Sequence, residues 1–165
     1  MKGEVNPFTI GWYIAPLINA ITRSGTLEEK TLIFEAFLDY EAVKMIPSTK
    51  RGHRKEQELK VEQAVRVAAN VKARQEKIKK EVFDSVLPQL EEQKDKPIIV
   101  VKFDPPINEN LNGLLANQIM GTYHKPTFVL NKNDDNWSGS ARSFASNQIA
   151  DWRSFVENSG YAEYA

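Results

Sequence analysis

Six residues near the C-terminal end combine the groups that proteins use to bind anions. Residues 138–143 read Ser-Gly-Ser-Ala-Arg-Ser, with no acidic residue among them. A guanidinium donates forked hydrogen bonds, hydroxyls add further donors, and glycine leaves backbone N–H groups accessible. Alternate residues of a strand share one face, so we expect Ser140 and Arg142 to point the same way. The pattern predicts a phosphate site. The other interpretation is an exposed strand edge on which Arg142 pairs with an acid of the protein.

A second candidate lies near the N-terminus, in the stretch APLINAITRSG of residues 15–25. Asn19 and Arg23 are four residues apart and therefore neighbours on one helical face. They could contact the same anion. The alternative is an ordinary amphipathic helix whose polar side faces solvent.

The residues for a complete catalytic site are missing from this sequence. It has no cysteine, which excludes a disulfide framework, a thiolate nucleophile and cysteine-ligated metals. His53 and His124 are the only histidines, and neither has an acidic residue or a second histidine at ligand spacing. No nucleophile elbow, phosphate-binding glycine loop or dinucleotide motif occurs. Read alone, the chain is not a complete enzyme.

Charge is unevenly distributed along a chain whose formal net charge is zero. Residues 44–80 contain twelve Lys or Arg against four Glu, a net of +8, and the rest of the chain carries −8. A basic block of this kind can face phosphates, or it can be solvated helix surface. No stretch approaches the roughly 20 apolar residues of a membrane span. Together with the absent cysteines, this predicts a cytoplasmic protein without a membrane contact.

The elements that would position these residues fall into three parts. Residues 1–46 form a helical section, in which Thr26 and Glu29 have the spacing of a capping box. One helical face there is expected to pack against another element, with Leu27, Thr31, Phe34, Leu38 and Val43. Residues 47–96 comprise a basic turn and a long connecting helix over 56–90, which Pro88 should end or kink. Its narrow apolar seam predicts packing against a neighbouring domain or a partner helix.

The third part, residues 97–165, changes period. An apolar, β-branched run over 97–103 and another over 125–131 flank a helix-like stretch, which predicts a βαβ unit with parallel strands. A third strand follows around residues 137–144, and then a last helix, capped by Asn147, that stops near Gly160. The fold class is therefore α/β: an N-terminal helical section and a long connecting helix, followed by a small sheet with a βαβ core covered by helices.

Three separated segments resemble one family. IAPLINAITRSG, LNGLLANQIMGTYHKPTFVL and GSARS are similar, in order and spacing, to motifs of the RecJ-type single-stranded-DNA exonucleases of the DHH family. Part of the long helix, NVKARQEKIKKE, resembles a fourth motif, and the looser spelling is typical of a phage or prophage member. Leu17 stands where the family commonly has an arginine, so no role of that arginine carries over.

The resemblance implies a function in two parts. It implies an N-terminal DHH domain that holds Mn²⁺ or Mg²⁺ and hydrolyses phosphodiesters, and a C-terminal DHH-associated domain. Because this sequence contains no Asp-His-His motif and stops before a glycine-histidine motif, it looks like an inactive C-terminal fragment without a metal site, truncated within the associated domain. The same resemblance implies exonuclease action, 5′ to 3′, in DNA repair and recombination. Single-stranded DNA is the implied partner, with a single-stranded-DNA-binding protein or a helicase as candidate protein partners.

By the same resemblance, specific residues would bind a DNA phosphate. They are Asn19, Arg23, Gly139, Ser140, Arg142 and Ser143. Two alternatives stay open from the sequence: a DHH-type phosphodiesterase for short oligonucleotides or cyclic dinucleotides, and a non-catalytic protein-interaction module.

Overall fold

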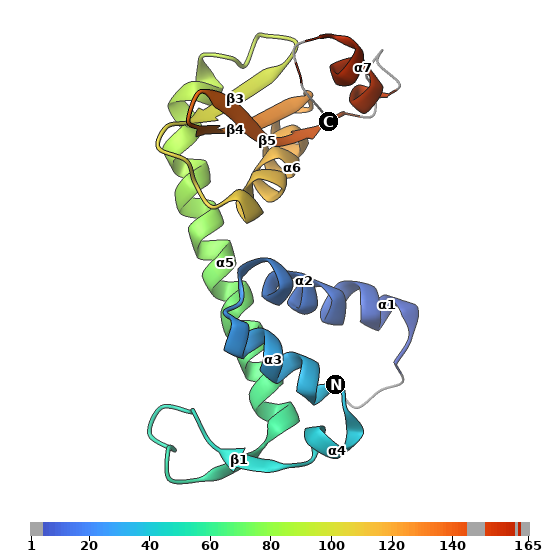
Figure 1. Cartoon of the computed structure of the whole chain (residues 1–165), viewed down its shortest axis with the longest axis vertical. Coiled ribbons are helices and arrows are strands. Elements are labelled where there is room, and N and C mark those ends of the chain that lie inside the picture. Colours follow the sequence, from blue (N-terminus) through green and yellow to red (C-terminus); the bar gives the residue numbers. More distant parts are fainter. Residues whose placement is uncertain (1–4, 145–150, 161, 163–165) are drawn as a thin grey trace. The chain divides into compact units, whose positions relative to one another are not determined.

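The computed structural model describes residues 5–144, 151–160 and 162. The chain divides into two compact units, Met1–Ile78 and Lys79–Ala165, each of which is described by itself. Figure 1 gives the order of the elements along the chain. Within the described residues, no helix combines the length and the apolar character needed to cross a membrane.

The first unit begins with helices, as expected for residues 1–46. Its helical elements are α1 (Pro7–Thr9), a π-helical turn (Ile10–Ile14), α2 (Ala15–Ser24), α3 (Leu27–Ala36) and α4 (Asp39–Ala42). The predicted capping box is confirmed: the backbone N–H of Glu29 donates to the Thr26 hydroxyl at 3.3 Å, and that of Thr26 to the Glu29 carboxylate at 2.8 Å. Both donors would otherwise be left unpaired at the start of α3.

The apolar face expected to pack in this helical section is instead exposed within its unit. Leu27 is 76% exposed, Phe34 69% and Val43 67%. The expected face assumed one continuous helix, but α3 ends at Ala36 and α4 begins only at Asp39. Ile33, the residue before Phe34 in α3, packs against the buried cluster of this unit.

A two-stranded hairpin follows, where the sequence predicted only a basic turn. β1 (Met45–Pro47) pairs with β2 (Gln57–Leu59) antiparallel, with Ile46 opposite Glu58. The long helix α5 (Lys60–Glu91) therefore begins four residues later than expected. Pro88 lies inside it and the helix ends three residues beyond, as predicted for a proline near a helix end.

The start of α5 is tied to the short helices by a buried lysine. Lys60 is 8% exposed and forms ion pairs with Glu35 of α3, at 2.8 Å, and with Glu41 of α4. Hydrogen bonds from its ammonium to Glu35 and Glu41 raise the pKa of Lys60. The charge is thus retained in a place from which solvent is largely excluded.

The apolar seam of α5 packs within the first unit. Ala68 and Val71 form a buried cluster with Ile21 of α2. One turn further along, the buried Gln75 amide donates to the Ser24 hydroxyl at 2.7 Å. Leu17 packs against this cluster, which gives the residue at the expected arginine position an apolar role. The seam is thus covered by a helix of the same chain.

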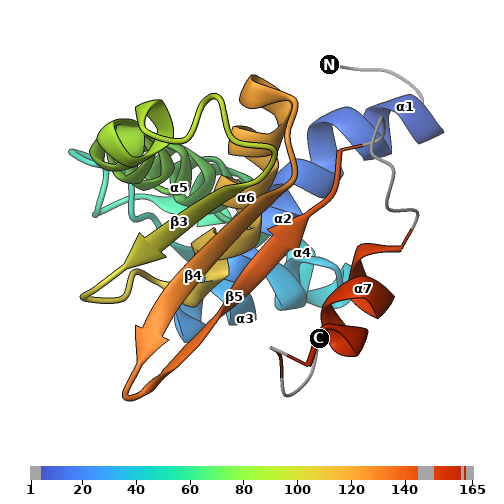
Figure 2. The same ribbon diagram turned by 90° about the horizontal axis from the view of Figure 1, so that it is seen from above.

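The second unit contains the predicted βαβ core. It comprises η2 (Glu109–Leu111), α6 (Asn112–Tyr123), α7 (Trp152–Asn158) and the strands β3 (Ile99–Phe103), β4 (Thr127–Asn133) and β5 (Asn136–Arg142). β3 and β4 are parallel, β4 and β5 antiparallel, in the order β3-β4-β5, and Figure 2 shows the three strands side by side. The α/β fold class is confirmed, and β5 is the expected third strand.

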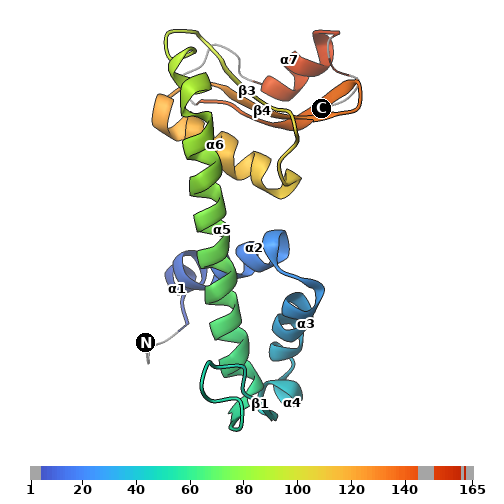
Figure 3. The ribbon, with the colours of Figure 1, turned by 90° about the vertical axis from the view of Figure 1, so that its left-hand side faces the viewer.

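Helices cover both faces of this sheet. Figure 3 shows α6 on one face of the sheet and α7 on the other. Trp152 of α7 contacts Phe128 of β4 edge to face, with ring centroids 5.6 Å apart. The expected cap Asn147 lies outside the described residues; the described helix is capped by Asp151, whose carboxylate accepts from two backbone N–H groups.

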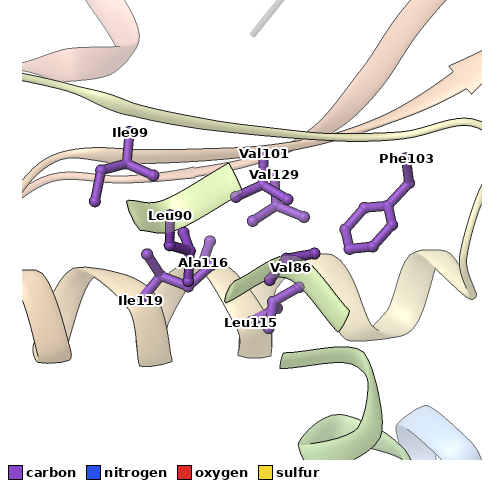
Figure 4. Close-up of a cluster of buried hydrophobic side chains, with 9 residues drawn as sticks. All are labelled: Val86, Leu90, Ile99, Val101, Phe103, Leu115, Ala116, Ile119 and Val129. Atoms are coloured by element: carbon purple, nitrogen blue, oxygen red, sulfur yellow. The ribbon is translucent and has the colours of Figure 1, made fainter. Parts of the chain in front are cut away.

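The core of the second unit lies between the sheet, α6 and the end of α5. Figure 4 shows its nine buried side chains: Val86, Leu90, Ile99, Val101, Phe103, Leu115, Ala116, Ile119 and Val129. Burial of these side chains is the main stabilising contribution to this unit. It orients the sheet so that one face of β5 looks toward α6.

Two glutamines protect the free edge of the sheet: Gln89 lies in the last turn of α5, and Gln93 lies in the turn that follows the helix. The Gln93 amide donates to the Val100 carbonyl and accepts from the Val100 N–H, both at 2.9 Å. Gln89 repeats this pattern with Lys102, both at 3.2 Å. Gln89 and Gln93, which are four residues apart, thus form hydrogen bonds with Lys102 and Val100, which are two residues apart on β3. The side-chain amides take the place of a neighbouring strand, and so they block an edge that could otherwise pair with another chain.

Candidate nucleic-acid interface

Ser140 and Arg142 share the face of β5 that looks toward α6. Ser140 is opposite Val129 of β4, and Arg142 is opposite Thr127; Val129 and Thr127 are fully buried. Since side chains on paired residues of a sheet lie on the same side, both site residues project toward the helix. The spacing in the sequence predicted that the two side chains share a face, but not that this face is turned toward α6.

The Arg142 guanidinium lies over the first turn of α6. A Cβ built on Gly113 would be 2.9 Å from Arg142 Nη2 and 3.6 Å from Ser140 Oγ. Gly113 therefore leaves the space that the guanidinium occupies. Three residues from two elements come together here: Gly113 from α6, and Ser140 and Arg142 from β5.

Arg142 has no ion-pair partner in the described part of the chain. It is exposed, and its one described hydrogen bond runs from Nη1 to the Ala141 carbonyl at 2.7 Å. An arginine carries five N–H donors, so one backbone contact leaves most of that capacity for solvent or a ligand. The alternative interpretation, an arginine paired to an acid of the protein, does not fit the described residues.

Gly139 is required for a different reason from the one expected. A Cβ at this position would lie 1.9 Å from the Val129 carbonyl oxygen and 2.9 Å from the Leu130 Cα. Both are backbone atoms of β4, which cannot move aside cheaply. The glycine thus allows close approach of two strands. Through that approach it positions Ser140 and Arg142, its neighbours on β5.

The remaining predicted residues lie on other parts of the chain. Ser143 is exposed and follows the end of β5. Asn19 and Arg23 are exposed on α2, in the first unit, so each unit presents its own candidate residues. Arg23, like Arg142, has no ion pair with a described residue.

Sequence reasoning missed two residues at the start of α6. Gly113 shapes the place of the guanidinium, and the neighbouring Asn112 is 3% exposed with its Oδ1 unpaired within the described chain. Both residues could have been found in the sequence, because the segment that carried the family resemblance begins Leu-Asn-Gly.

The described residues do not provide a metal site. Over residues 5–144, 151–160 and 162, no three His, Asp or Glu side chains gather as metal ligands would. No step of a metal-assisted reaction is assigned to these residues.

The chain is similar to known proteins over nearly its whole length. No protein-family model matches the chain. A protein of Bacillus subtilis strain 168, from the SPbeta prophage, is 30% identical over 99% of this chain and is named as a single-strand DNA-specific exonuclease. Its counterpart in Bacillus phage SPbeta, with the same name, matches equally. The chain spans 29% of the length of these curated relatives.

The fold has a relative of known structure. Manganese-bound exonuclease RecJ matches with a TM-score of 0.55 and 19% identity, over 85% of this chain and 30% of that one. The resemblance to RecJ-type exonucleases is confirmed. The chain is similar to part of a phage-type exonuclease, and the structural match shows that it shares its fold with part of RecJ.

Proposed function

We propose that this chain is the DNA-binding portion of a RecJ-like, single-strand-specific exonuclease. In this proposal Arg142 and Ser140 bind a phosphate of the strand, either its 5′ end or a backbone phosphate near the cleavage site. Gly139 and Gly113 give these side chains room, and Ser143, Arg23 and Asn19 contribute further donors. The Mn²⁺ or Mg²⁺ that such an enzyme needs is held by residues outside this sequence, in keeping with the manganese-bound neighbour.

One observation carries the proposal: an exposed guanidinium aligned with a hydroxyl above a glycine, with no carboxylate beside it in the described chain. A phosphate accepts from a guanidinium through two parallel hydrogen bonds, and these charge-assisted bonds are about twice as strong as neutral ones. The name shared by the two relatives suggests that the strand is single-stranded DNA.

Replacing Arg142 tests the proposal directly. We expect Arg142→Ala to weaken binding of 5′-phosphorylated single-stranded DNA by about 10- to 100-fold, as the loss of a hydrogen-bonded charge of roughly 1.5–3 kcal/mol implies. The matched control is Arg153→Ala, in the same unit, since Arg153 already pairs with Glu157 at 2.9 Å. Fluorescence anisotropy with labelled oligonucleotides measures both. Equal affinities for the two variants would contradict the role of Arg142.

Gly113→Ala provides a second test that leaves the arginine in place. The new methyl group would displace the end of a flexible side chain, so the fold should tolerate it. We expect the melting temperature to hold or rise, because alanine favours a helix over glycine. The affinity for DNA should fall at the same time, because the guanidinium moves. A variant that binds DNA as the wild type does would show that this position of Arg142 has no role in binding.

We also propose that the isolated chain has no nuclease activity. Labelled single-stranded DNA should remain intact with Mn²⁺ and substoichiometric protein. Metal-dependent products under these conditions would overturn the assignment of a binding portion. The wider context, 5′-to-3′ action in DNA repair and recombination in the cytoplasm, with a DNA-binding protein or helicase nearby, follows from the proposed enzyme.

A protein-interaction role is the second candidate, favoured by one surface of the first unit. An apolar groove lies between α2 and α3, lined by Ile18, Ile21, Ile33, Phe34 and Phe37. Phe34 and Phe37 are more than two-thirds exposed, and apolar surface of this kind often marks an interface. Size-exclusion chromatography of the chain tests for self-association. A dimer broken by Phe34→Ser would raise this candidate above DNA binding.

A further inference from the structure

The hairpin of the first unit presents a concentrated positive charge. The basic tip, defined as residues 49–57 between β1 and the start of β2, contains Lys50, Arg51, Arg54 and Lys55 against one acid, Glu56. Every residue of the tip is exposed. Gly52 allows the tight turn, with a φ of +84° that favours glycine.

A buried carboxylate anchors the base of this tip. Glu58 of β2 is 4% exposed and contacts residues of the basic tip and of α5. It accepts from the Gln63 amide at 2.9 Å and from the Thr49 N–H at 3.3 Å, and it pairs with Lys50 at 3.1 Å and with Arg66.

The Gln63 side chain contacts both strands of the hairpin. Its amide also donates to the Pro47 carbonyl of β1, at 3.1 Å, so this residue of α5 holds β1 and β2 together. The tip is thus held on a defined base, which reduces the entropy lost when it binds a ligand.

Three cations of the tip are left without a described acidic partner. Lys50 forms an ion pair with Glu58, and His53 contacts Glu56 at 2.8 Å, an acidic neighbour that the reading of the sequence overlooked. Arg51, Arg54 and Lys55 form no ion pair with any residue in the described ranges. Like charges this close in sequence repel one another, and an external anion would relieve that repulsion.

The tip is chemically suited to a phosphate backbone and poorly suited to a protein. Residues 49–57 include no aliphatic and no phenyl or indole side chain. Protein interfaces depend on such anchors at their centre. Contacts with nucleic-acid phosphates need only cations and hydrogen-bond donors, and arginine is the preferred residue.

We propose that the basic tip is a second contact for nucleic acid, in which Arg51, Arg54 and Lys55 bind backbone phosphates without reading the base sequence. For its ligand, single-stranded DNA, this inference rests on the proposed function. It differs from the Arg142 site because it requires no strand end. The tip therefore adds affinity along the strand, equally for phosphorylated and unphosphorylated 5′ ends.

Salt dependence gives the test its magnitude. Each phosphate neutralised on a single strand adds about 0.7 to the slope of log K against log salt. Replacing the three cations, in R51A/R54A/K55A, should therefore lower the slope by about 2. When the salt concentration rises from 50 to 200 mM, the factor by which affinity falls should be roughly 16 times smaller for the variant than for the wild type. Anisotropy titrations of the full 165-residue chain with labelled oligothymidylate measure this.

A matched triple variant separates local contact from net charge. Lys30, Lys80 and Lys96 are exposed and make no ion pair in the described structure, so K30A/K80A/K96A removes the same three charges elsewhere. We expect its slope to stay close to that of the wild type. If the two triple variants have equal slopes, the proposal of a tip contact is wrong.

The possible failures can be told apart. A wild-type chain that does not bind single-stranded DNA at all would overturn the proposed function and this inference together. A wild-type chain that binds, with Arg142→Ala impaired and the tip variant unchanged, would overturn the inference alone. Circular dichroism of each variant confirms that the helices are retained, which is expected because the tip residues are exposed.

Discussion

Replacing glycine by alanine should change the stability of the second unit in opposite directions at Gly139 and at Gly121. Gly139 lies on β5, and the Cβ of an alanine there would be 1.9 Å from a carbonyl oxygen of β4. Gly121 lies on α6, and a Cβ there would meet nothing within 4 Å. The same substitution, glycine to alanine, therefore removes chain flexibility in both places but creates a clash in only one.

The expected magnitudes follow from this geometry. At Gly121, alanine should stabilise the protein by about 0.5–1 kcal/mol, the usual difference between the two residues in a helix. At Gly139 the contact must be relieved by separating β4 from β5, and overpacking of this kind costs about 1–3 kcal/mol. In a chain of this length each kcal/mol shifts the melting temperature by about 2–4 °C. We expect Gly139→Ala to melt several degrees lower and Gly121→Ala a few degrees higher than the wild type.

Thermal unfolding followed by tryptophan fluorescence is a suitable assay. Trp137 and Trp152 both lie in the second unit and report on its sheet. Urea unfolding of the same variants gives the free energy of unfolding independently of temperature. Gly121→Ala is the control for any general effect of the added methyl group.

The refuting result is a stable Gly139→Ala variant. If it melted at or above the wild-type temperature while DNA binding fell, the glycine would serve the ligand through its backbone N–H, as the sequence first indicated. If stability and binding both fell, the close approach of the strands would account for both losses.

Two further predictions concern buried polar contacts. Hydrogen bonds from Gln63 first, and then from Lys50, Ser48 and the Thr49 N–H, lower the pKa of Glu58 from 4.5 to about 2 against the opposing effect of burial. Because the folded protein favours the ionised form, the Glu58 carboxylate contributes its full stabilisation above pH 4.5. That contribution should disappear as the pH falls from about 4.5 to about 2 and the carboxylate is protonated. Urea unfolding at a series of pH values checks this: Glu58→Gln should flatten the acid limb, whereas the exposed control Glu56→Gln should leave it unchanged. At the sheet edge, Gln93→Ala removes both side-chain hydrogen bonds to Val100, of about 0.5–1.5 kcal/mol each, and it should destabilise the second unit and promote association through β3. Denaturation together with light scattering measures both effects, and a monomeric variant as stable as the exposed control Glu92→Ala would contradict the protective role.

Several elements could be predicted from residues close together in the sequence. The capping box at Thr26 depends on atoms three residues apart, and the βαβ order follows from two apolar, β-branched runs around a helical stretch. The shared face of Ser140 and Arg142 follows from the two-residue period of a strand. These features are local, so the order of residue types was sufficient to predict them.

Other features depended on contacts that no local pattern encodes. β1 and β2 have three residues each, too few for an alternating signal, and they are joined through the buried Glu58. The apolar spacing revealed neither the break between α3 and α4 nor which residue of α3 would pack, since Ile33 packs on a cluster built from α2 and α5.

The candidate site shows the same division between sequence and structure. The sequence determined which groups can bind a phosphate: a guanidinium and hydroxyls on alternate positions of one strand. Only the tertiary structure placed α6 beneath them, with Gly113 leaving room for the guanidinium, and pressed β4 against Gly139. The physical reason is that donor chemistry belongs to each side chain, whereas the space around it is set by segments brought together when the core of the unit packs.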